Sequence, residues 1–183
     1  MSFTRQSQQG IGLVEVLVAL VVISLGVLGM AGLQLTGMKQ SSNGFNRAKA
    51  VMLAESMTTR MRINRIGVVD GHYNHFDSLQ ETCSVLPSPY CQAYGNNDAQ
   101  DCDAAQLAAF DKYSVACGEW NGQAAIGGVA GLMPADTRLQ VQCNDATCTA
   151  ESSYTLNVTW PESPNASSNE PVKSSRVQMR LRP

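Results

Sequence analysis

An uninterrupted apolar run near the N-terminus constrains this chain more than any other feature. From Val16 to Leu35 there is no charged side chain, and the only polar ones are Ser24 and Gln34. A helix needs about 20 apolar residues to cross a bilayer, so the run predicts a transmembrane helix. The run is too long for the apolar region of a removable signal peptide, and no small-residue cleavage site ends it. We therefore expect it to be retained.

One carboxylate stands at the head of the run. Glu15 directly precedes the apolar residues and follows Gly10 by five positions. A charge inside the hydrocarbon costs roughly a few kcal/mol, so such a residue is a functional candidate. If the chain is cut after Gly10, Ile11 gains a free α-amine, which is cationic at neutral pH. Glu15 would lie one helical turn away and could pair with that amine or with a neighbouring subunit's amine.

These residues resemble the N-terminus of type IV pilins and of the related pseudopilins of type II secretion. The segment GIGLVEVLVALVVISLGVLG follows a short polar leader whose only charge is Arg5. The resemblance implies that a prepilin peptidase cuts between Gly10 and Ile11 and methylates the new terminus, and that Glu15 acts in assembly. The usual motif is G-F-T-L-I-E. Here Ile11 and Gly12 replace Phe and Thr, which favours a minor subunit.

The sequence of this segment is most similar to that of the PilV-type minor pilins. The resemblance implies a role in pilus priming and assembly, twitching motility and adhesion. It also implies these partners: other minor pilins, the major pilin, the prepilin peptidase, the inner-membrane assembly machinery and, before assembly, the lipid bilayer. Arg5 on the short side of the span favours a cytoplasmic leader and a C-terminal part on the other side of the membrane. The resemblance implies that this part is periplasmic and that the subunit is later transferred to a cell-surface pilus. A secretion pseudopilin and a single-pass anchor carrying a periplasmic binding domain are the alternatives.

Beyond Leu35 the sequence becomes amphipathic. Apolar residues recur at three- and four-residue spacing, which predicts a helix with one buried stripe. The stripe consists of Ala50, Leu53, Ala54, Met57 and Met61. The opposite side carries Lys49, Glu55, Ser56, Thr59 and Arg60. Without a proline before Pro87, we expect one helix from about Ile11 to about Ile66, with any bend near Ser41–Gly44. Three glycines in the apolar run favour either close helix packing or a locally weakened helix: Gly26, Gly29 and Gly32.

The remainder predicts a globular α+β domain. From Gly67 to Gly131 the sequence is rich in turn residues and predicts long loops, with one short helix over Asp103–Tyr113. Apolar and polar residues then alternate over 139–143, 154–160 and 177–181, which predicts three half-buried strands. We expect these strands to be antiparallel and to cover the helix stripe.

The predicted fold class is therefore pilin-like α+β. A long N-terminal helix has a transmembrane half and an amphipathic half, and it packs on a C-terminal antiparallel sheet with disulfide-stapled loops. The expected domains are a cleaved leader (1–10), a membrane and filament-core helix (11–35), the amphipathic half (36–66) and a periplasmic globular domain (67–183).

All six cysteines lie beyond the predicted helix: Cys83, Cys91, Cys102, Cys117, Cys143 and Cys148. An even number confined to the part beyond a membrane span predicts disulfides in an oxidising compartment. Sequence does not choose among the connectivities, although Cys143 and Cys148 are close enough to clip a turn between strands. Zinc is disfavoured because no pair has C-x-x-C spacing.

No catalytic constellation is recognisable. The sequence lacks a nucleophile elbow, a zinc-protease motif, a phosphate loop and a dinucleotide fingerprint, so we expect neither an enzyme nor a cofactor. His72 and His75, beside Asp70 and Asp77, could hold a metal, but we interpret them as exposed loop residues and expect no metal. A net charge of −2 gives no support for nucleic-acid binding. Basic residues do recur at two places and are expected to be solvated: Arg60, Arg62 and Arg65, and Lys173, Arg176, Arg180 and Arg182.

Overall fold

The computed structural model of the chain describes residues 12–94, 96–162 and 173–182. It divides into two compact units, one ending at Ser42 and one beginning at Asn43. Helix α1 (Leu13–Ile63) is assigned without a break, through Ser41–Gly44 as well. The long-helix prediction is confirmed.

In the first unit, the side chains of α1 are exposed from Leu13 to Leu35. Two of its hydroxyl groups bond within the helix: the Ser24 hydroxyl donates to the Leu20 carbonyl (2.7 Å), and the Thr36 hydroxyl donates to the Gly32 carbonyl (3.0 Å). The unit thus exposes an apolar surface, and these two hydroxyls need no water because they donate their hydrogen bonds to helix carbonyls.

Helix α1 ends three residues earlier than expected, at Ile63 rather than Ile66. Asn64 leaves the helical conformation (φ −93°, ψ 59°), and its side chain accepts a hydrogen bond from the Gly67 amide at 3.1 Å. It thereby caps a second short helix, α2 (Arg65–Val69). Asparagine competes with the helix by bonding nearby backbone, which explains the early stop.

The second unit contains a four-stranded antiparallel sheet in the order β1-β4-β5-β6. Its strands are β1 (Phe76–Asp77), β4 (Arg138–Cys143), β5 (Tyr154–Pro161) and β6 (Ser174–Leu181). The three predicted strands are confirmed. The two-residue β1 is too short to leave an alternating pattern and was not expected.

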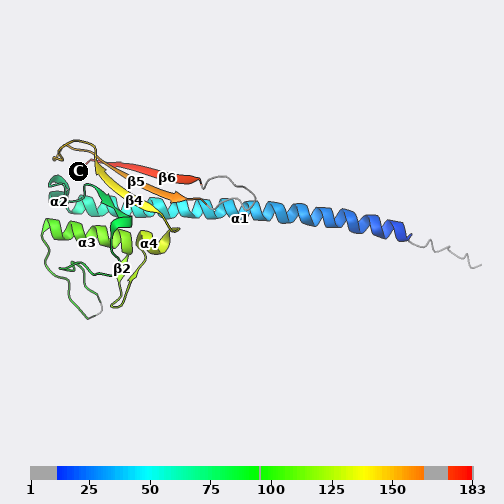
Figure 1. The fold of residues 1–183 in the computed structure, drawn as a ribbon, viewed down its shortest axis with the longest axis horizontal. Coiled ribbons are helices and arrows are strands. Elements are labelled where there is room, and N and C mark those ends of the chain that lie inside the picture. The colour runs from blue at the N-terminus through cyan, green and yellow to red at the C-terminus, as the bar shows by residue number, and fades with distance from the viewer. Residues whose placement is uncertain (1–11, 95, 163–172, 183) are drawn as a thin grey trace, which may run out of the picture. The chain divides into compact units, whose positions relative to one another are not determined.

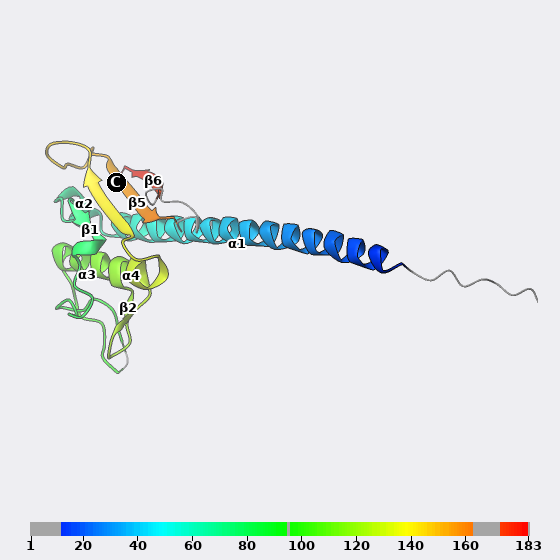
Figure 2. The same cartoon turned by 45° about the vertical axis from the view of Figure 1, so that its right-hand side comes forward.

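The sheet is apolar on one face only. Leu139, Val141, Leu156 and Val158 are buried on the inner face and share one core with the α1 stripe. Figures 1 and 2 show the C-terminal part of α1 running between this sheet and helix α3 (Ala104–Cys117). The outer face carries the alternating polar residues, as a half-exposed antiparallel sheet requires.

Residues 67–131 hold more regular structure than predicted. Besides α3 they form η1 (Ser78–Gln80), a hairpin of β2 (Glu119–Trp120) and β3 (Ala125–Ile126), and α4 (Gly128–Leu132). The expected helix over Asp103–Tyr113 is confirmed and extends to Cys117. Asp103 and Gln106 form a capping box at its start. Gly118 ends it at φ +94°, where a Cβ would lie 2.0 Å from the Ile126 carbonyl oxygen.

Candidate functional site

Glu15 lies in the first turn of α1. Its backbone amide donates to the Gly12 carbonyl at 2.9 Å, and its side chain is exposed. The predicted cleavage residues Gly10 and Ile11 lie outside the described residues, so the Gly10–Ile11 junction stays a prediction. Among the described helices, α1 is long and apolar enough to cross a membrane, by length and composition.

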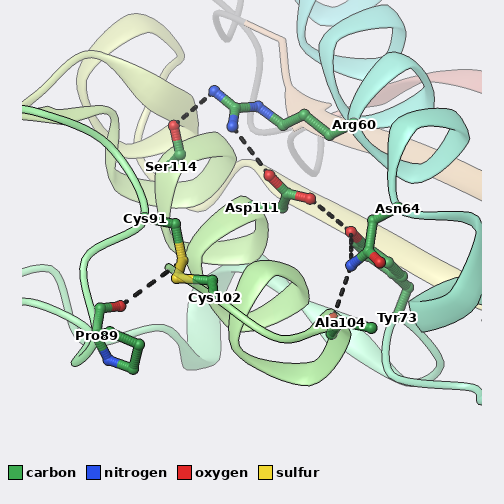
Figure 3. Close-up of polar contacts among 9 residues, drawn as sticks. All are labelled: Arg60, Asn64, Tyr73, Pro89, Cys91, Cys102, Ala104, Asp111 and Ser114. Atoms are coloured by element: carbon green, nitrogen blue, oxygen red, sulfur yellow. Dashed lines mark hydrogen bonds and ion pairs between the residues drawn. A yellow bond between two sulfur atoms is a disulfide. The ribbon is translucent and has the colours of Figure 1, made fainter. Parts of the chain in front are cut away.

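A buried polar network joins α1 to α3 in the second unit (Figure 3). Arg60 of α1 forms an ion pair with Asp111 at 3.0 Å and donates to the Ser114 hydroxyl at 2.9 Å. The Tyr73 hydroxyl donates to the other Asp111 oxygen at 2.5 Å. Asn64 donates to the Tyr73 oxygen at 3.0 Å and to the Ala104 carbonyl at 2.7 Å. The network therefore ties the end of α1 to Tyr73, in the turn after α2, and to α3.

Burial sets the electrostatics of this network. Asp111 is only 3% exposed, and burial raises its pKa, while hydrogen bonds from Tyr73 and Arg60 act in the opposite direction. Burial and the neighbouring carboxylate also raise the pKa of Tyr73, so its hydroxyl remains a donor. The Arg60 guanidinium also lies 5.7 Å from the centroid of the Phe110 ring. A buried carboxylate with this many donors has a structural role, because each of its oxygens is satisfied.

Sequence reasoning placed Arg60 on the solvated side of the helix, and this was wrong. Arg60 follows the polar-side pattern, and its partner Asp111 lies 51 residues away. The one available signal was Asp111 itself, a carboxylate beside Phe110 in the predicted short helix.

The six cysteines form three disulfides, so the disulfide prediction is confirmed and none of the described cysteines is free. Cys83 bonds to Cys117, Cys91 to Cys102, and Cys143 to Cys148. The first bridge fastens the loop after η1 to the end of α3. The second closes a loop before α3 (Figure 3), and the third clips the connection between β4 and β5.

One residue from each basic run lines the same groove. Arg62 of α1 and Arg180 of β6 line one shallow groove together with Glu55. His72 and His75 belong to no group of three or more His, Cys, Asp or Glu side chains that could hold a metal, in the part of the chain that the structure describes. Asp77 forms an ion pair with Arg138 at 3.4 Å instead.

Comparison with protein families matches two adjoining segments of the chain. A model of the prokaryotic N-terminal methylation motif matches residues 5–31, and a model described as type IV pilin Tt1218 matches residues 32–113. No curated protein and no solved structure matches the chain. The two matched segments follow each other along α1 and into the disulfide-bonded domain, and the chain belongs to the type IV pilin family.

Proposed function

We propose that this pilin is a minor subunit of a type IV pilus, of the PilV type, that contributes to pilus priming and assembly, twitching motility and adhesion. A type IV pilin assembles with other pilins and is processed by a prepilin peptidase, so the chain is a structural subunit and a peptidase substrate. Its partners before and during assembly are the inner membrane, the assembly machinery, other minor pilins and the major pilin.

The observation that carries the proposal is a long surface of exposed apolar side chains with one carboxylate at its head. From Val16 to Leu35 this surface needs an apolar surrounding, which lipid and the core of a filament both supply. We propose that residues 11–35 form the membrane and filament-core part of the helix, residues 36–66 its amphipathic half, and residues 67–183 the periplasmic domain. Removal of residues 1–10 frees the Ile11 amine.

Glu15 is the proposed determinant of axial register. A carboxylate in this segment needs a cationic partner, and the amine of a neighbouring subunit supplies one in the filament core. A negative group in the first turn also suits the helix dipole. N-methylation keeps that amine cationic. Intact mass of the assembled subunit tests the cleavage: we expect a chain that begins at a methylated Ile11, and retention of Met1 contradicts it.

The main alternative function is that of a pseudopilin of type II secretion, because the N-terminus of a pseudopilin follows the same pattern. The decisive experiment deletes the gene for this protein and measures, in the same strain, the number of surface pili and the amount of secreted enzymes. We expect pili or motility to decline while secretion is unchanged. A secretion defect with normal pili would contradict the pilus role and indicate a pseudopilin.

A further inference from the structure

The outer face of the sheet is hollowed beside its shortest strand. A pocket of about 200 Å³ opens there, and a single water needs only about 10–15 Å³ of such space. Six polar side chains line it: His75, Asp77, Gln80, Gln140, Gln142 and Asn157. Four of the six are amides, drawn from η1, β4 and β5. A solvated sheet face explains polar residues, but it does not explain a concave group of amides.

One residue that lines the pocket has a side-chain atom without a hydrogen-bond partner among the described residues. The Asn157 side-chain oxygen is buried, and it has no hydrogen-bond partner among the described residues. Buried acceptors are rarely left without a donor, so this oxygen is suited to a ligand or solvent donor. Asn157 lies opposite Gln140 in the ladder of β4 and β5, which brings the two amides together.

The neighbouring groups are held in place. The Asp77 carboxylate accepts hydrogen bonds from the Leu79 amide at 3.1 Å and the Gln140 side chain at 3.1 Å. The Gln140 side chain makes this bond with its NH₂ group, and its carbonyl oxygen has no hydrogen-bond partner among the described residues. His75, at the rim, has a left-handed backbone (φ 59°). Asn74 supports that turn by accepting from the amides of His75 at 3.0 Å and Cys143 at 2.9 Å.

The chemistry of the lining selects an uncharged ligand. An anion would meet the Asp77 carboxylate and the amide acceptors. A cation would find the Asp77 carboxylate already paired with Arg138. Amides both donate and accept, and the free oxygens of Gln140 and Asn157 call for O–H donors. We propose that this pocket binds one ring of a neutral saccharide. The proposal names the ligand class for the adhesion part of the proposed function and rests on it only for its cellular role.

The sheet supplies a matched control. Gln140, Asn157 and Gln178 form one cross-strand row on the outer face. Gln178 is exposed on β6 and does not line the pocket, whereas Gln142 is exposed on β4 and does. Gln142→Ala and Gln178→Ala therefore remove the same group from the same face, inside and outside the pocket. Neither side chain has a hydrogen-bond partner among the described residues, so both variants should fold.

The test uses the full-length protein in lauryldimethylamine oxide, because a maltoside detergent carries the proposed ligand chemistry. D-galactose, D-mannose and N-acetyl-D-glucosamine are titrated with saturation-transfer NMR as the readout. We expect at least one sugar to bind. Gln142→Ala and Asn157→Val should weaken its binding at least tenfold, and Gln178→Ala should leave it unchanged. Asn157→Val should also raise the melting temperature, because it removes the unpaired oxygen.

Two results would overturn the inference: no binding of any of the three sugars at millimolar concentration, or binding that Gln142→Ala and Gln178→Ala weaken equally. Incorporation into sheared pili is counted separately in cells. Sugar binding without incorporation would leave the pocket standing and remove the proposed pilus role. Incorporation without sugar binding would do the reverse.

Discussion

The two parts of α1 belong to one helix but have different surroundings. Between Val16 and Leu35 its apolar side chains are exposed on every side, whereas between Ala50 and Met61 one stripe is buried in the domain core. A helix that is apolar on every side requires an apolar environment, whereas an amphipathic helix buries its one apolar face in the core of its own domain. The comparison shows that one secondary-structure element can be stabilised by its own fold at one end and by its surroundings at the other.

The largest effect on filament assembly that we expect comes from Glu15→Ala, which tests whether the exposed part of α1 is built for assembly. Membrane insertion should be unharmed, since the span becomes more apolar. Incorporation into sheared pili, relative to the membrane pool, should fall at least tenfold, a change of about 1.4 kcal/mol or more, because a neighbour's amine loses its partner. Glu15→Asp keeps the charge with a shorter reach and should fall between. If Glu15→Ala leaves the ratio of pilus to membrane subunit unchanged, Glu15 has no role in assembly and is only a residue of the membrane anchor.

Arg60→Ala should be the most destabilising change in the packed part of α1. It leaves the buried Asp111 without its cation, and removal of one partner from a buried pair costs about 3–5 kcal/mol. Denaturant unfolding, followed by tryptophan fluorescence, gives the loss. The control is Arg62→Ala, an exposed arginine two residues along the same helix. Equal losses for the two variants would show that Arg60 acts as a surface residue.

Met57 and Met52 sharpen the contrast between the buried and exposed sides of the packed part. Met57 is 0% exposed and Met52 is 68% exposed. Met57→Ala should cost about 2–5 kcal/mol of unfolding free energy, while Met52→Ala should change it by less than about 0.5 kcal/mol. The same unfolding experiment measures both. A Met57→Ala loss as small as that of Met52→Ala would contradict the core assignment.

The smallest effect concerns Gly29, in the exposed part. A Cβ there would meet no atom within 4 Å, so Gly29→Ala should stabilise the helix by at most about 1 kcal/mol. Circular dichroism in detergent checks the helix. Pilus incorporation then tests whether this glycine has a role in the filament. A decline despite a more stable helix indicates close packing or required looseness in the filament, and no change shows that the glycine is incidental.

Periodicity explains which elements could be predicted and which could not. The strands β4, β5 and β6 and the buried stripe of α1 repeat their pattern over many residues, so local sequence was sufficient. The strand β1 and the hairpin of β2 and β3 have two residues per strand and carry no periodic signal. The end of α1 was predicted three residues late because the side chain of Asn64 caps α2, a local hydrogen bond that periodicity does not report.

The sequence by itself determined the apolar run with its single carboxylate, the long helix, the three strands and the confinement of the cysteines to the part of the chain beyond that helix. These follow from composition and from contacts between near neighbours in the chain. Only the tertiary structure decided that Arg60 pairs with Asp111, which cysteines bond, and that Gln80, Gln140 and Asn157 share one hollow. Such groupings join residues far apart in the chain, and what brings them together is the packing of a whole core, which no local pattern encodes.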